Sequence, residues 1–167
     1  IALSLDNLGD VALALGAYEE ARQRYLSSLE IYREYDDRAG IVISLSGLGD
    51  VAAALEDYDA AREHFYEAFN LASTIRDTPL TLWILTGIAA LLSKTGEAER
   101  AAELIGLILD HYATPREARD RAQAVLASLR SSQALPVVDD ALQRGRALDG
   151  AETTRELYLM AEKRWMF

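Results

Sequence analysis

A forty-residue period constrains this chain more than any other feature of its sequence. The segment Leu8-Gly9-Asp10-Val11-Ala12 recurs as Leu48-Gly49-Asp50-Val51-Ala52. Each copy is followed by an aromatic residue, an Ala-Arg pair and a second large aromatic residue, and a weaker third copy begins at Ile88. A fixed period of this length is typical of stacked repeats, in which each unit buries its apolar face against its neighbours. The period therefore predicts an all-α fold built from antiparallel helix pairs.

Apolar residues recur at helical spacing through the repeats. They predict three helix pairs, at about residues 1–37, 38–77 and 78–112. The period fails beyond the third pair, and terminal elements of a repeat stack must cover its exposed end. Residues 1–112 are therefore the predicted repeat domain, and residues 113–167 are predicted to form its C-terminal helical cap.

Two glycines lie inside the predicted first helices of their pairs. Glycine in a helix interior costs about 1 kcal/mol relative to Ala, so Gly9 and Gly49 need a packing reason. Since a residue without a side chain lets another helix approach, we expect them to meet Ala21 and Ala61 of the second helices.

Helix signals continue in the tail. The segment Thr114-Pro115-Arg116-Glu117 is a capping box that begins a helix running to about Ser131. A short helix over Pro136–Arg144 is expected to end near Gly145, and a last helix is expected after Asp149. The chain as a whole is thus predicted to contain about nine helices.

The charge of the chain lies mainly in the repeats. The formal net charge is -10, and residues 1–112 hold 8 of the basic and 19 of the acidic residues. An acidic surface repels phosphate backbones, so we expect no direct contact with nucleic acid by this segment. No apolar run approaches the roughly 18 residues that a membrane span needs, and no secretory leader opens the chain. We expect a cytoplasmic protein without membrane contact, and we read the chain, which begins at Ile1 within a repeat, as a piece of a longer one.

No set of residues predicts catalysis. The chain has no cysteine, and His64 and His111 lack neighbours at metal-ligand spacing. Gly47-Leu48-Gly49 falls inside a predicted helix and so cannot cradle a phosphate, while Ser44 and Ser46 have no recognisable base. We therefore expect a protein that is not an enzyme and that holds no metal or cofactor.

The repeats resemble the tetratricopeptide repeat. The resemblance is carried by a Leu-Gly pair, an aromatic residue, an alanine, a second aromatic residue and a small residue. These are Leu8-Gly9, Tyr18, Ala21, Tyr25 and Ser28 in the first copy, and Leu48-Gly49, Tyr58, Ala61, Phe65 and Ala68 in the second. The period of 40 residues departs from the 34 of the ordinary type. The resemblance implies a right-handed superhelical solenoid of antiparallel helix pairs.

Repeats of 40 residues are similar to the repeat region of large bacterial ATPase transcription regulators of the LuxR and AfsR types. Gly145-Arg146-Ala147-Leu148 in the tail is similar to the ending common in that group. This narrower resemblance implies a signalling or transcription-regulatory protein with an ATPase module outside this chain.

In the tetratricopeptide family the first helices of the pairs line a concave groove. Carried over by repeat register, the groove is predicted to hold Asp6, Asn7, Asp10, Ser46, Asp50, Trp83, Thr86 and Lys94. Carboxylates beside an aromatic anchor suit a basic or amphipathic protein or peptide segment. We expect an interaction, sensor or scaffold module that binds a partner, an effector or another domain of the same protein. The alternative is a purely structural module that mediates homo-oligomerisation or packs against an ATPase domain.

Overall fold

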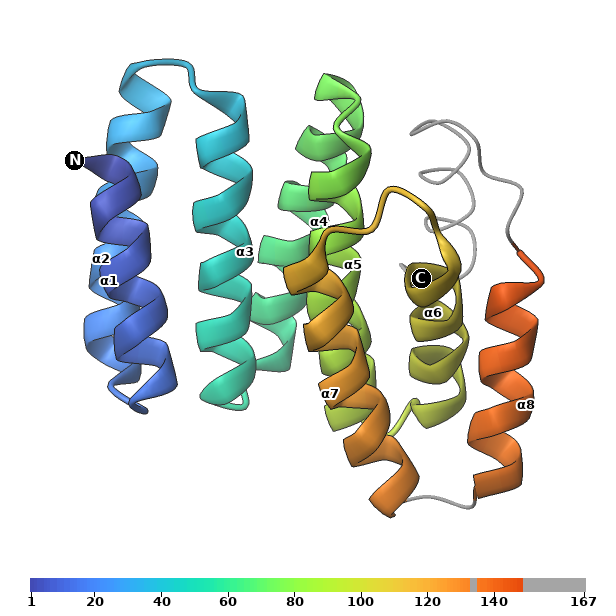
Figure 1. Ribbon diagram of the computed structural model, residues 1–167. Helices are drawn as coiled ribbons and strands as arrows, with labels where there is room; N and C mark the ends of the chain where they lie inside the picture. The colour runs from blue at the N-terminus through green and yellow to red at the C-terminus, as the bar shows by residue number, and fades with distance from the viewer. Residues whose placement is uncertain (133–134, 149–167) are drawn as a thin grey trace. The chain divides into compact units, whose positions relative to one another are not determined.

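The computed structural model describes residues 1–132 and 135–148, and all regular structure in those ranges is α-helical (Figure 1). Three consecutive antiparallel pairs are followed by two further helices. The pairs are α1 (Ala2–Ala14) with α2 (Tyr18–Glu34), α3 (Arg38–Ala54) with α4 (Tyr58–Ile75), and α5 (Thr78–Lys94) with α6 (Ala98–Asp110); the last two helices are α7 (Arg116–Ser132) and α8 (Leu135–Arg146). The prediction of an all-α fold of helix pairs is confirmed. The predicted ninth helix lies outside the described residues.

The turns inside the pairs repeat with the same period as the sequence. Gly16, Glu56 and Gly96 all adopt positive φ, at 75°, 63° and 85°, directly after the first helix of each pair. Glycine adopts this left-handed conformation without penalty, whereas a residue with a side chain is strained there. Glu56 therefore adopts the same turn conformation as the two glycines, and its backbone is strained there.

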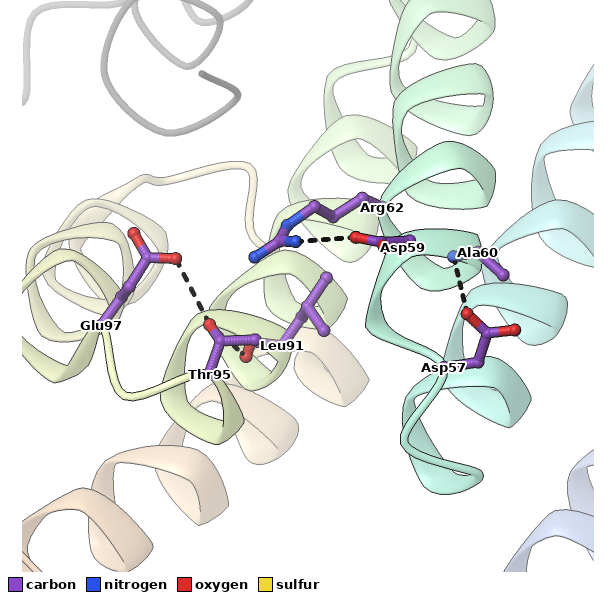
Figure 2. A network of polar contacts seen from close by, with 7 residues as sticks. All are labelled: Asp57, Asp59, Ala60, Arg62, Leu91, Thr95 and Glu97. Atoms are coloured by element: carbon purple, nitrogen blue, oxygen red, sulfur yellow. Dashed lines mark hydrogen bonds and ion pairs between the residues drawn. The ribbon is translucent and has the colours of Figure 1, made fainter.

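Acidic side chains begin several of the helices. Asp37 Oδ1 accepts a hydrogen bond from Gly40 N at 3.0 Å, and Asp77 Oδ1 accepts one from Leu80 N at 2.8 Å. Figure 2 shows the equivalent bond from Ala60 N to Asp57 Oδ1, at 3.1 Å. These bonds satisfy backbone N–H groups that have no partner within the helix. Three acids of the repeats, Asp37, Asp57 and Asp77, therefore serve to start helices.

The chain forms two compact units, Ile1–Ile75 and Arg76–Phe167. In the first unit, Tyr25 of α2 is buried against glycines of both α1 and α3. A Cβ added at Gly9 would lie 2.8 Å from the Tyr25 ring, and one added at Gly47 would lie 2.4 Å from it. A Cβ at Gly49 would similarly lie 2.9 Å from Phe65 of α4. The close packing predicted for Gly9 and Gly49 is present, but the nearest side chains are these aromatics and not Ala21 and Ala61.

The second unit contains the third pair and the tail helices. Helix α7 packs on α5 and α6, and α8 packs closely on α6. Gly106 and Gly145 let the backbones of α6 and α8 touch, because a Cβ at Gly145 would lie 1.8 Å from Glu103 O. Helix α8 ends at Arg146, one residue after Gly145, so the prediction of a short helix that ends near Gly145 is confirmed. None of the described helices combines the length and the apolar character that a bilayer crossing requires.

Candidate partner-binding surface

The residues predicted to line one groove belong to both units. Asp6, Asn7 and Asp10 lie on α1 and Ser46 and Asp50 on α3, all in the first unit. Trp83, Thr86 and Lys94 lie on α5, in the second unit. The two groups are described separately below, and their union into one groove stays a prediction.

Three of the predicted acids act on one phenol in the first unit. The Tyr25 hydroxyl donates a hydrogen bond of 2.6 Å to Asp10 Oδ1. Burial raises the pKa of Tyr25, and the hydrogen bond to Asp10 and the negative charges of Asp10, Asp50 and Asp6 raise it further. Asp10 is exposed and Asp50 is half-buried. The Asp10 carboxylate is thus hydrogen-bonded to this hydroxyl from α1, and the charge of Asp50 acts on it from α3; both carboxylates retain access to solvent.

Asp6 lies beneath this surface. Its side chain is buried, and Asp6 Oδ1 accepts a hydrogen bond of 2.9 Å from the Ser44 hydroxyl. Ser44 Oγ is 3.2 Å from Ser28 Oγ, and the Ser28 hydroxyl donates to Ala2 O at 3.1 Å. Burial raises the pKa of Asp6, and the hydrogen bonds from Ser28, Ser44 and Tyr32 offset only part of that effect. Asp6 therefore joins α1, α2 and α3 internally.

Tyr32 belongs to the same buried network. Burial and the charge of Asp6 raise the pKa of Tyr32 to about 12. Its ring lies against Gly40 of α3, where a Cβ would come within 2.2 Å. Tyr25 and Tyr32 are thus two large side chains of α2 that pack against glycines of α3, and sequence reasoning placed neither at the site. The glycines spaced seven residues apart in α3, Gly40 and Gly47, were the available signal.

In the second unit, the predicted aromatic anchor is already engaged. Trp83 is half-buried, and the Arg121 guanidinium of α7 lies 5.3 Å from its ring centroid, a cation–π contact. The Thr86 hydroxyl is buried in its own helix and donates to Trp83 O at 2.7 Å. Lys94 is exposed in the last turn of α5. Arg121 was not predicted, and nothing in the repeat pattern points to it because it lies beyond the third pair.

Three of the residues predicted to line the groove are buried. Asp6, Ser46 and Thr86 have exposed fractions of 2%, 1% and 0%. A buried side chain offers no atom to a partner, so the prediction that these three line an open groove is wrong. Asn7, Asp10 and Asp50 in the first unit, and Trp83 and Lys94 in the second, retain solvent-exposed surface.

Polar contacts elsewhere lie within a helix, at a turn, or between helices of the same unit, as in the 3.2 Å ion pair of Arg33 on α2 with Glu67 on α4. Arg62 donates to Asp59 Oδ1 at 3.2 Å in the first unit, and Thr95 Oγ1 lies 3.3 Å from Glu97 Oε1 in the second (Figure 2). His111 is buried, and its Nδ1 accepts a hydrogen bond of 3.1 Å from Ala113 N. Across residues 1–132 and 135–148, no three His, Cys, Asp or Glu side chains gather in a way that could hold a metal ion.

Helix pairs repeated every 40 residues, with turns of the same left-handed geometry, define a helical-repeat protein. The tetratricopeptide repeat family model matches residues 1–74 and 40–112, which together span all three pairs. The chain belongs to the tetratricopeptide repeat family. A comparison with curated proteins finds no match. Tetratricopeptide repeats generally mediate protein–protein interactions and are typically non-catalytic.

Proposed function

We propose that this chain is a protein-interaction module of a larger bacterial signalling or transcription-regulatory protein, working in the cytoplasm. The regulatory context rests on the 40-residue period and on the Gly145-Arg146-Ala147-Leu148 segment of the tail. In this proposal residues 1–112 hold the partner, and residues 113–167 cap the repeats. The packing of α7 and α8 on the third pair supports the capping role.

The observation that carries the binding proposal is the Asp10 carboxylate held by the Tyr25 hydroxyl, with a second acid, Asp50, at the equivalent position of α3. Tyr25 is buried and hydrogen-bonded to Asp10, so the acid is held on a rigid helix pair. Asp50 adds its charge at the same hydroxyl. Fixed charges of one sign favour a partner of the opposite sign and speed its association. The ligand is accordingly a basic or amphipathic protein segment, with Trp83 of α5 as a further contact.

The test is a pull-down from the native lysate followed by titration of the recovered partner at low and high salt. Asp10→Asn with Asp50→Asn should weaken binding about tenfold and flatten its salt dependence, since Coulomb attraction is screened by salt. Asn can still accept the hydrogen bond from Tyr25, so folding is retained. Trp83→Ala should weaken binding independently of salt.

The matched control removes two exposed acids of the first unit elsewhere, Glu30→Gln with Glu63→Gln. This variant has the same net charge as the double Asn variant and should bind almost as wild type. Equal partner recovery by all variants would exclude the acidic surface as the working one.

Self-association is the competing function, and one observation favours it. Helix α1 exposes large apolar side chains, including Leu8 and Val11. A stable dimer in sedimentation that the acidic variants leave intact would favour this structural role.

A further inference from the structure

A chain of four oxygen atoms joins the first three helices inside the first unit. Asp6 Oδ1 of α1 lies 2.9 Å from Ser44 Oγ of α3, and Ser44 Oγ lies 3.2 Å from Ser28 Oγ of α2. Ser28 Oγ in turn lies 3.1 Å from Ala2 O at the start of α1. The side chains of Asp6, Ser28 and Ser44 are all buried. The contacts therefore run from α1 through α3 and α2 back to α1, away from bulk solvent.

This chain of oxygens has fewer hydrogens than contacts when Asp6 is ionised. Each of its three contacts needs one hydrogen, but each of the two serine hydroxyls has only one to give, and Ala2 O has none. The Ser28 hydroxyl donates to Ala2 O, and the Ser44 hydroxyl is within donor distance of both Asp6 and Ser28. With an ionised Asp6, one contact therefore holds two oxygens together without a hydrogen between them.

A proton on Asp6 Oδ1 supplies the missing hydrogen. Asp6 then donates to Ser44, Ser44 donates to Ser28, and Ser28 donates to Ala2 O. The 2.9 Å contact in which Ser44 donates to the carboxylate is thus made in the reverse direction. Hydrogen bonds that follow one another in this way polarise and strengthen each other. The neutral acid therefore completes the chain, whereas the carboxylate leaves one contact unfilled.

The second oxygen of Asp6 favours the neutral form as well. Asp6 Oδ2 is buried, and no group in the described part of the chain gives it a hydrogen bond. The hydroxyls of Ser28 and Tyr32 also act on the carboxyl group but leave Oδ2 without a partner. A buried ionised oxygen without a hydrogen bond costs much more free energy than a neutral carbonyl oxygen in the same place.

The titratable groups that face Asp6 do not favour its ionised form. Burial raises the pKa of Asp6, and the negative charge of Asp10, one turn further along α1, raises it further. Burial also raises the pKa of Tyr25 and of Tyr32 of α2, and the charge of Asp6 adds to that effect. From α3, Asp50 adds its negative charge at Tyr25. None of these neighbours is positively charged, so none of them offsets an ionised Asp6.

From these contacts we propose that Asp6 is a proton-operated latch of the first helix. The neutral acid closes the hydrogen-bond chain and holds α1 on α2 and α3. When its proton is released to water, one contact loses its hydrogen, a buried anion is left behind, and α1 opens more often. The latch is therefore closed at low pH and loosens as pH rises above 3.8, the ordinary pKa of an aspartic acid. It is tested without a partner, so this proposal and the proposed function can fail separately.

The protonation state of Asp6 is measured directly by an NMR titration of the whole chain labelled with carbon-13 in its aspartates. The carboxyl signal of Asp6 is assigned by its absence from the spectrum of Asp6→Asn. This signal should titrate at a pH above 3.8. Titration at or below 3.8 would overturn the proposal, because the folded protein would then favour the carboxylate over the neutral acid.

The latch itself is measured by hydrogen exchange of α1, followed by mass spectrometry and corrected for the intrinsic pH dependence of exchange. Protection of α1 should fall about tenfold for each pH unit between 3.8 and the midpoint measured for Asp6, since local opening is linked to loss of the proton. Helix α4 of the same unit is the internal reference and should change little. Asp6→Asn should keep constant protection of α1, because Asn is neutral at every pH.

The matched control is Asp10→Asn, which removes an exposed carboxylate from the same helix. This variant retains Asp6, so protection of α1 should still fall with pH, at a slightly lower pH because the charge of Asp10 is gone. Circular dichroism checks that each variant keeps its helix content. A loss of protection as large in Asp6→Asn as in the wild type would assign the effect to other groups. That result would overturn the latch, and so would wild-type protection that stays constant across the NMR midpoint.

Discussion

Replacing Gly47 with Ala should loosen the packing of α2 on α3. The added methyl carbon would lie 2.4 Å from Tyr25 Cε1 and 2.6 Å from Cζ, far inside van der Waals contact. The ring cannot simply move towards α1, because the Gly9 backbone borders it on that side, where a Cβ would lie only 2.8 Å away. A shift of the ring would also strain the 2.6 Å hydrogen bond from Tyr25 to Asp10.

The expected magnitude is a difference between two opposing effects. Gly→Ala in a helix interior stabilises by about 1 kcal/mol. Overpacking of a filled core costs about 1–3 kcal/mol, and a disturbed hydrogen bond costs about 1 kcal/mol more. The net effect is a destabilisation of about 1–3 kcal/mol, or a decrease in Tm of roughly 2–12 °C for a chain of this size.

The assay is chemical and thermal unfolding followed by circular dichroism, with a double-mutant cycle to Tyr25→Ala. If the clash is the cause, Gly47→Ala should cost little or even stabilise when Tyr25 is already Ala, giving a coupling energy of about 1 kcal/mol or more. Gly49→Ala, whose methyl carbon would meet Phe65 at 2.9 Å, should be the milder variant. Gly47→Ala as stable as wild type in the presence of Tyr25 would refute the packing argument.

Four further predictions concern single contacts. Asp6→Asn should remove a pH dependence of stability. Because burial raises the folded-state pKa of Asp6, the protonated carboxyl stabilises the wild type at low pH, and this contribution is lost as pH rises above 3.8. In urea titrations, the free energy of unfolding of the wild type should therefore decrease relative to that of the variant as pH rises. Tyr25→Phe should lose about 1 kcal/mol with the bond to Asp10, measured by urea unfolding, and an unchanged midpoint would contradict it. Glu56→Gly should relieve the left-handed strain and stabilise by up to about 1 kcal/mol, visible as a higher Tm. Gly145→Ala should separate α8 from α6 and increase hydrogen exchange in both helices, because its methyl carbon would overlap Glu103 O.

The helix pairs could be predicted from the sequence because the period and the apolar spacing specify local structure at every position. The same pattern could not identify the partners of the glycines. Gly9 and Ala21 are both small and were expected to meet, but the ring of Tyr25 reaches across and fills the space at Gly9. The position of a residue in the repeat predicts which face of the helix it lies on. Which side chain fills the space beside a glycine depends on the length and rotamer of the side chains on the neighbouring helix.

For the candidate site, too, the sequence predicted which helices carry the residues but not which side chains are buried. Register equivalence placed Asp10 and Asp50 on neighbouring first helices, and both do act on Tyr25. Register equivalence could not show that Asp6 is buried. Asp6 lies on the same helix as the exposed residues Asn7 and Asp10, so the sequence predicts that it is exposed with them. Only the convergence of Ser28 and Ser44 on Asp6 from two other helices reveals it as an internal contact.

The informative positions are those where equivalent residues differ between repeats. Asp6 corresponds to Ser46, and Asn7 corresponds to Gly47, so the first pair differs from the second where each packs on its neighbours. Gly47 makes room for the Tyr25 ring of α2, whereas Asn7 carries a side chain at the equivalent place in α1. Leu8 and Val11 are the same residue types as Leu48 and Val51. The two first helices therefore share their apolar residues but differ at the place where α3 accommodates an aromatic ring.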